Sequence, residues 1–284
     1  MNEEISLEQA LNDVSIGTVA AIERIEMEAW ADYYAAAPAA FAREVGLSAT
    51  RVNDFALFAM KNSSITLFNR SLGMGVARAV DKAALDEATT WLRNHCGPAW
   101  AVPLAAGALP AELPAWLAEK GLTLATPGIA KFWRLATRPA EGARCPYDIR
   151  LVAPAQAADF GITAQQGFEM EEGFDTWLAA LCGRPRWRTY VAYDGATPAG
   201  VGAMFVKDGL AWFGMGATLP AYRGRGVQSA LLARRIGEAV ALGATMMSID
   251  TSHAGLGEPP NASHRNVIRA GFSLAYFRPQ YVTQ

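Results

Sequence analysis

The sequence has 284 residues and a formal net charge of −2, with 51% hydrophobic and 18% charged residues. This balance excludes a disordered chain, and the lack of net positive charge argues against a nucleic-acid-binding protein. No apolar run approaches the roughly 20 residues that span a bilayer, so we expect no membrane segment.

The cysteines and the N-terminus indicate a cytoplasmic protein. Cys96, Cys145 and Cys182 are well separated and show no CxxC spacing. This argues against a disulfide framework or a cysteine-rich zinc site, and His95 beside Cys96 has no further ligands nearby in the sequence, so we expect no metal. The first residues, MNEEISLEQALNDV, lack the basic start and apolar core of a signal peptide.

The first predicted element is a helix within residues 5–35, where apolar residues recur at helical spacing. Residues 40–59 are helical or mixed, and residues 63–78 predict a strand and a turn, with Ile65, Leu67 and Leu72 as strand residues. Two interpretations of Arg70 stay open: it faces an acceptor substrate, or it belongs to an ordinary loop.

A helix follows Asp81, a good N-cap, and ends at Gly97. A strand at 99–104, a helix at 110–121 and a strand at 130–136 complete the first half. Residues 138–146 are rich in Pro, Gly and charge, which predicts an interdomain linker. We therefore expect an N-terminal α/β domain at 1–140 and a second domain at 147–284.

The second half has a clearer order of elements. A strand, two helices, three strands, a helix, a strand, a helix and a last strand are predicted, at residues 148–152, 154–168, 174–183, 187–195, 199–207, 210–218, 229–243, 245–252, 261–271 and 272–282. Asp208 and Gly209 predict a hairpin turn. The acidic turn with Glu169, Glu171 and Glu172 is either a site for a cationic amine or a solvated turn.

A Gly/Arg loop between the strand at 210–218 and the following helix predicts a phosphate site. The first turn of a helix has N–H groups without intrahelical partners and carries partial positive charge. Gly224 and Gly226 permit positive φ or a close approach of an anion, while Arg223 and Arg225 add charge. The loop matches neither a P-loop nor a GxGxxG motif.

The segment from Arg223 to Gln228 resembles motif A of the GNAT superfamily, the acyl-CoA-dependent N-acyltransferases. Gln228 stands where the family usually has Gly or Ala. A second helix with Asn261, Ser263 and Asn266, closed by Gly271 and Phe272, resembles motif B. The resemblance covers residues 147–284 and implies an α+β fold, with a mixed, mostly antiparallel twisted sheet flanked by helices.

The resemblance also implies which residues bind acetyl-CoA, the acyl donor. They are Met215, Gly216, Ala217, Arg223, Gly224, Arg225, Gly226, Val227, Gln228, Ser229, Asn261, Ser263 and Asn266. Backbone N–H groups of the strand ending in residues 215–217, which splays from its neighbour in the family, would bind the pantetheine arm and polarise the acyl carbonyl. Asn261 and Ser263 are alternatively only helix caps.

The catalytic residues are less clearly indicated. Counted back from Gly271, the family's usual Tyr acid falls on Val267, which cannot donate a proton. Asp250 or His253 is a candidate base, and Tyr276 a candidate acid, but a loop cap, an exposed loop residue and sheet packing are the structural alternatives.

The first half lacks the Gly/Arg loop, and two interpretations stay open: a degenerate GNAT repeat or an unrelated domain. Its residues 115–135 share a helix, Gly and strand order with the C-terminus, which favours a repeat. The predicted function is an N-acetyltransferase acting on an amine of a small molecule or protein. The alternatives are a non-catalytic CoA-binding sensor and a nucleotide-binding protein. Neither nucleic acid nor membrane is an expected partner, and a homodimer stays open.

Overall fold

A computed structural model describes residues 14–137, 146–252 and 259–283. Within these residues, 11 strands form one sheet in the order β1-β2-β3-β4-β11-β5-β10-β9-β8-β7-β6. Neighbouring strands are antiparallel except for two parallel pairs, β3 with β4 and β9 with β10. The predicted α+β fold with a mostly antiparallel sheet is confirmed.

The first half contains four described helices and five strands. They are α2 (Ile16–Ala35), α3 (Ala39–Val45), β1 (Leu47–Val52), β2 (Phe55–Met60), β3 (Arg70–Leu72), α4 (Lys82–His95), β4 (Ala101–Pro103), α5 (Leu113–Glu119) and β5 (Thr123–Leu135). Asp81 caps α4 as predicted, because its carboxylate accepts from the N–H of Ala84 over 2.7 Å. The predicted strand at 63–78 is wrong in extent: Ile65 and Leu67 lie in turns, and only residues 70–72 pair with β2.

The second half follows the predicted order. Its elements are β6 (Asp148–Leu151), α6 (Ala157–Phe168), α7 (Phe174–Ala179), β7 (Trp187–Asp194), β8 (Thr197–Lys207), β9 (Leu210–Thr218), α8 (Val227–Ala241), β10 (Met246–Ser252), α9 (Ala262–Arg269) and β11 (Ser273–Val282). The predicted hairpin joins β8 to β9, and both turn residues, Asp208 and Gly209, have positive φ.

From α2 to β5, the first half has the same order of elements as the second half from α6 to β11. The two helix, Gly and strand segments correspond, since Gly121 and Gly271 both follow a helix with φ near +80° (84° and 81°). This order supports the interpretation of the first half as a repeat. The linker residues 138–145 lie outside the described part of the chain, so the boundary between 140 and 147 stays a prediction.

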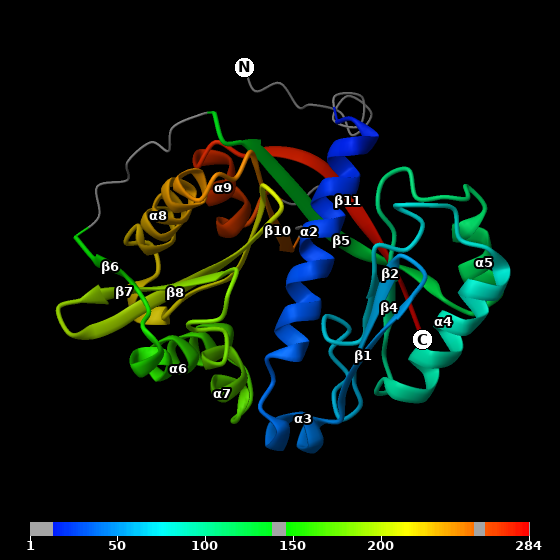
Figure 1. The fold of residues 1–284 in the computed structure, drawn as a ribbon, viewed down its shortest axis with the longest axis horizontal. Coiled ribbons are helices and arrows are strands. Elements are labelled where there is room, and N and C mark those ends of the chain that lie inside the picture. The colour runs from blue at the N-terminus through cyan, green and yellow to red at the C-terminus, as the bar shows by residue number, and fades with distance from the viewer. Residues whose placement is uncertain (1–13, 138–145, 253–258, 284) are drawn as a thin grey trace.

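The last strands of the two halves are exchanged. Strand β5 pairs with β10 and β11 of the second half, while β11 pairs with β4 of the first half. Figure 1 shows β5 and β11 crossing the molecule side by side, with α2 in front of them. The sheet is therefore continuous from one half to the other.

The two halves also share a hydrophobic core on one face of this sheet. One cluster of buried side chains combines residues of α2, such as Ile22 and Tyr33, with residues of α6 and α7, such as Phe160 and Trp177. On the other face, α4 and α5 cover one cluster and α8 and α9 another. Helix α2 is thus packed against both halves.

Candidate functional site

A cavity of about 1020 Å³ lies where β9 and β10 end and α8 begins. Its walls come from β9, β10, α8 and α9 of the second half and from five described residues of the first half. The latter are Trp30, Tyr33, Leu67, Phe68 and Ile129. These residues are far from motif A in the sequence, and the packing of α2 against both halves and the pairing of β5 with β10 bring them to the site.

Strand β9 separates from β10 at the cavity. Their parallel ladder runs from Met246 and Leu210 to Ile249 and Phe213, and beyond that point β10 keeps only its pairing with β5, on its other edge. A bulge lies opposite: Gly202 of β8 faces two residues of β9, and one of these, Met215, has a φ of 50°. Residues 214–218 line the cavity, so the predicted splay is present at Met215, Gly216 and Ala217.

The Gly/Arg loop has the geometry of an anion site. Gly224 and Gly226 have φ values of 77° and 84°, and a Cβ on either would meet open space. Helix α8 starts directly after Gly226 with no side-chain cap and no acidic residue in its first turn. The first N–H groups of α8 are therefore free of intramolecular capping at the cavity wall, where they suit a phosphate.

The predicted cofactor residues of this loop take different positions. Arg223, Gly224, Gly226, Val227, Gln228 and Ser229 line the cavity. Arg225 is not among the lining residues, and its guanidinium lies over the ring of Tyr222, 5.7 Å from the centroid. The Gln228 amide donates to Thr218 Oγ1 over 3.0 Å, so this departure from the usual Gly or Ala ties the loop to β9.

Helix α9 contributes the motif B residues. Asn261 caps it by accepting from the N–H of His264 over 2.9 Å, and its amide donates to the carbonyl of Ser252 over 2.7 Å. The capping interpretation is confirmed for Asn261, which is not a lining residue, whereas Ser263 and Asn266 line the cavity. Val267 is buried in the core under α9.

Sequence reasoning missed the other cations of the cavity wall. Arg265 and Arg269 of α9 line it, and their i, i+4 spacing is the signal that puts them on one face of the helix. Arg223 stands at the other side, 3.4 Å from Glu169. The end of the cavity near motifs A and B is therefore basic.

Asp250 is held in the cavity wall by two hydrogen-bond donors. Its Oδ1 accepts from Trp212 Nε1 over 2.9 Å and lies 3.4 Å from Lys131 Nζ. The side chain keeps 22% of its surface exposed. A carboxylate fixed by two donors and open to the cavity is suitably placed to bind a cation or to accept a proton.

Tyr276 does not reach the cavity. It is buried, and its hydroxyl donates to Glu23 Oε1 over 2.5 Å. Burial and the neighbouring Glu23 raise the pKa of Tyr276 well above 10.0. Its role as an acid stays a prediction without support from its position, and His253 lies outside the described residues.

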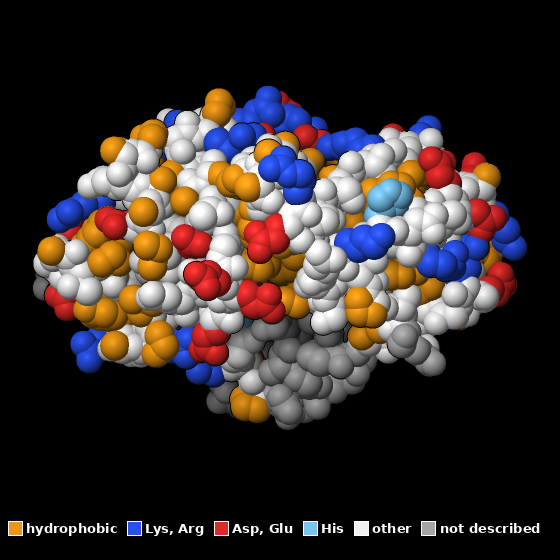
Figure 2. Space-filling view, turned by 90° about the horizontal axis from the view of Figure 1, so that it is seen from below, with side chains coloured by type: hydrophobic (Ala, Val, Ile, Leu, Met, Phe, Trp, Pro, Cys, Tyr) orange, Lys and Arg blue, Asp and Glu red, His pale blue; other side chains and the backbone are white. Residues whose placement is uncertain are grey.

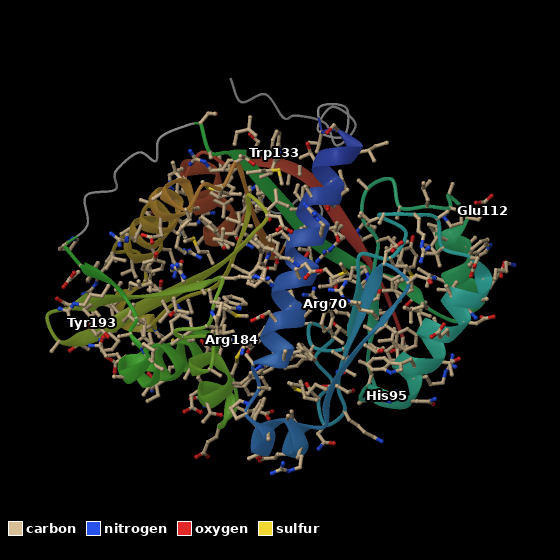
Figure 3. All side chains as sticks on the ribbon, in the orientation of Figure 1. Arg70, His95, Glu112, Trp133, Arg184 and Tyr193 are labelled. Atoms are coloured by element: carbon tan, nitrogen blue, oxygen red, sulfur yellow. The ribbon has the colours of Figure 1, made fainter. Side chains whose placement is uncertain are left out.

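Beneath Asp250 lies a buried ionic cluster that sequence reasoning missed. Glu26 Oε2 of α2 lies 2.7 Å from Lys131 Nζ and 2.6 Å from Arg278 Nη1. Arg70 is also buried, 3.4 Å from Glu26, and its guanidinium lies 4.5 Å from the ring centroid of Trp30. Figure 3 shows Arg70 next to α2. The interpretation of Arg70 as an acceptor-facing residue is therefore wrong, because its side chain is buried in this cluster and paired with Glu26.

Arg235 supports the bulge from below. It is fully buried in α8 and donates to the carbonyls of Ala203 and Gly214 over 3.0 and 3.2 Å. A Cβ at Gly202 would come within 2.8 Å of its guanidinium carbon, so the glycine makes room for it. The side chain thus connects α8 to both strands of the splayed hairpin.

Solved structures of known proteins share this arrangement. A GCN5-related N-acetyltransferase from Kribbella flavida matches with a TM-score of 0.61 over 94% of this chain and 95% of that chain, at 13% identity. The chain has the GNAT fold. A second GCN5-related N-acetyltransferase, from Sphaerobacter thermophilus, has a TM-score of 0.60 over 95% and 93% of the two chains, at 16% identity.

One of the similar structures is itself a tandem protein. A tandem GNAT protein from the clavulanic acid biosynthesis pathway matches over 96% of both chains, with a TM-score of 0.56 and 14% identity. Together with the repeated order of elements, this match supports the interpretation of the first half as a GNAT-like repeat, which stays a prediction. No family model and no curated protein matches the sequence.

Two further features concern only the described residues. Among them, no group of three or more His, Cys, Asp or Glu side chains is arranged to hold a metal ion. None of the helices within 14–137, 146–252 and 259–283 combines the length and apolar character that crossing a membrane requires.

Proposed function

We propose that this protein is an N-acyltransferase that moves an acetyl group from acetyl-CoA to a primary amine of a small molecule or protein. The observation that carries the proposal is the uncapped start of α8 beside the splayed end of β9, on the wall of one cavity. A phosphate site next to free strand backbone fits a cofactor with a pyrophosphate and an amide-containing arm.

The charges in the cavity also support acetyl-CoA and an amine as the two substrates. Arg223, Arg265 and Arg269 line the cavity from motifs A and B, and Asp250 is the one carboxylate among the described lining residues. The phosphates of CoA match the arginines. An amine, which is cationic before it reacts, matches the carboxylate.

Acetyl-CoA supplies an acetyl group activated as a thioester. In the proposed reaction, the bound ammonium group first gives one proton to Asp250, directly or through a water molecule, and the neutral amine attacks the acyl carbonyl, which the backbone of residues 214–217 orients. The C–N bond forms as the C–S bond breaks, and the second amine proton passes to solvent. Since Val267 is apolar and Tyr276 is buried, the thiolate, with a thiol pKa of about 8.5, is protonated by solvent.

The alternative is a CoA-binding sensor without catalysis. The observation in its favour is that the position of the family's usual Tyr holds Val267, packed in the core. A sensor binds CoA with no turnover, so binding and turnover separate the two functions.

The test measures CoA binding by calorimetry and thiol release from acetyl-CoA with a panel of primary amines. Gly226→Glu places a carboxylate at the start of α8, and we expect it to weaken CoA binding about 10-fold or more. Gly195→Glu is the matched control, since Gly195 also has positive φ and open space but lies in the β7–β8 turn. Equal CoA binding by both variants would contradict the proposed cofactor site, and CoA binding without thiol release on any amine would support the sensor.

A further inference from the structure

The first half supplies an apolar wall to the cavity. Trp30 and Tyr33 come from α2, and Leu67 and Phe68 come from the turn before β3. From the second half, Phe168 and Met170 add to the same lining. The donor site proposed above uses none of these six side chains.

This apolar wall is rigid. Tyr33 stacks on Trp177 with ring centroids 3.9 Å apart and an angle of 4° between the rings. The ring centroids of Trp30 and Phe68 lie 6.1 Å apart, and the guanidinium of Arg70 lies over the Trp30 ring. Such an interlocked set of aromatic side chains offers a preformed surface for a flat or apolar group.

Two polar atoms of this wall have no hydrogen-bond partner among the described residues. They are Trp30 Nε1 and Tyr33 Oη, and both are buried. An unpaired buried donor costs free energy, so native proteins usually pair it.

Acidic side chains lie beside the apolar wall, where Asp250 is paired with Lys131 and Glu169 with Arg223. Asp250 is the one carboxylate among the described lining residues. Glu169, Glu171 and Glu172 are exposed on the turn that carries the lining residues Phe168 and Met170. Viewed from the end of the molecule where α3 and α7 lie, acidic side chains gather around a hollow with apolar side chains near its middle (Figure 2). A cationic group is favoured here and an anionic one is disfavoured.

We propose that the apolar wall and Asp250 together form the acceptor subsite, and that its substrate is a primary amine with an aromatic or other apolar group and no carboxylate next to the amino group. This inference rests on the proposed function and names its substrate class. Asp250 binds the ammonium group, and the side chains of Trp30, Tyr33, Leu67 and Phe68 contact the apolar group. An α-carboxylate would lie near Asp250 and be repelled.

The first experiment compares three amines on the unmodified protein: 2-phenylethylamine, phenylalanine and 1,4-diaminobutane. We expect kcat/KM for 2-phenylethylamine to exceed each of the others by about 10-fold or more, because phenyl burial and the lack of a carboxylate both favour it. Preference for phenylalanine or for 1,4-diaminobutane would overturn the proposal.

Binding is also measured without turnover, by the quenching of tryptophan fluorescence, since Trp30 and Trp212 line the cavity. The titration is repeated with and without CoA. If CoA fails to bind while 2-phenylethylamine binds, the donor site is wrong and the acceptor subsite stands. If CoA binds and none of the three amines does, the acceptor subsite is wrong and the donor site stands.

Two variants place a cation in the same turn. Leu67 is 38% exposed and lines the cavity, whereas Ile65 is 50% exposed and does not. We expect Leu67→Lys to raise KM for 2-phenylethylamine about 10-fold without changing KM for acetyl-CoA, and Ile65→Lys to change neither. Equal acceptor KM values for the two variants would contradict the subsite.

Discussion

Lys131 of β5 donates a hydrogen bond to Glu26 of α2 over 2.7 Å, and both side chains are completely buried. The same ammonium group lies 3.4 Å from Asp250, which opens to the cavity. The first half therefore holds the candidate base of the second half through one buried lysine. This arrangement depends on the exchange of β5 into the other repeat, where Lys131 pairs directly with Asp250 in the ladder.

Glu26→Gln tests the buried cluster. The variant leaves Arg278, Lys131 and Arg70 without their shared carboxylate, and breaking a buried ion pair costs about 3–5 kcal/mol. Urea unfolding measures the loss. Glu28→Gln, on the same helix, is the control: Glu28 is partly exposed in its pairs with Lys207 and Arg51, so we expect a loss below about 1 kcal/mol. Similar losses in both variants would argue against a stabilising cluster.

The same carboxylate predicts acid sensitivity. Burial acts to raise the pKa of Glu26, but the charges of Arg278, Lys131 and Arg70 outweigh it and hold this pKa well below 4.5. A lowered carboxyl pKa stabilises the folded state above the unfolded-state pKa, and the contribution is lost as the pH falls below about 4.5. We expect the difference in unfolding free energy between the natural protein and Glu26→Gln to be constant near neutral pH and to shrink in acid. If this difference in unfolding free energy grew as the pH fell, it would contradict a lowered pKa of Glu26.

Asp250→Asn tests the proposed base. The amide keeps the shape of the side chain but does not accept a proton, so we expect kcat to fall about 10²–10⁴-fold. CoA affinity, measured by calorimetry, stays unchanged because the proposed CoA contacts come from the Gly/Arg loop and β9 rather than from Asp250. Asp208→Asn is the control, since Asp208 lies in the β8–β9 turn with positive φ, which Asn tolerates. Full activity of Asp250→Asn would show that another group accepts the proton from the amine.

Arg235→Met tests the support of the splayed hairpin. The change removes the donors to Ala203 and Gly214, and we expect it to cost about 2–4 kcal/mol of stability and to weaken CoA binding. Arg234→Ala, on the exposed side of the same helix, removes an i, i+4 pair with Glu238 and a contact with the ring of Tyr190, and we expect it to cost less than about 1 kcal/mol. Chemical denaturation and calorimetry measure both effects. Unchanged CoA affinity in Arg235→Met would show that the bulge is not required for CoA binding.

The local features of the second half were predictable because neighbouring residues determine them. Gly224 and Gly226 have the positive φ that their loop requires, Asn261 caps its helix, and Asp208 and Gly209 form the hairpin turn. Each depends on backbone sterics or on a hydrogen bond across a few residues. Motif A could therefore be recognised in the sequence, and the order of elements around it predicted the GNAT fold.

The sequence alone determined the Gly/Arg loop, the caps and the succession of helices and strands in the second half. Only the tertiary structure decided that β5 lies between β10 and β11, that Glu26 and Arg70 are buried, and that Trp30 and Tyr33 line the cavity. Strand partners and shared cores arise from contacts between residues far apart in the chain, and no local spacing encodes them. From sequence alone, the side chain of a glutamate on a helix is expected to be exposed. The cationic partners that allow Glu26 to be buried come from three distant strands.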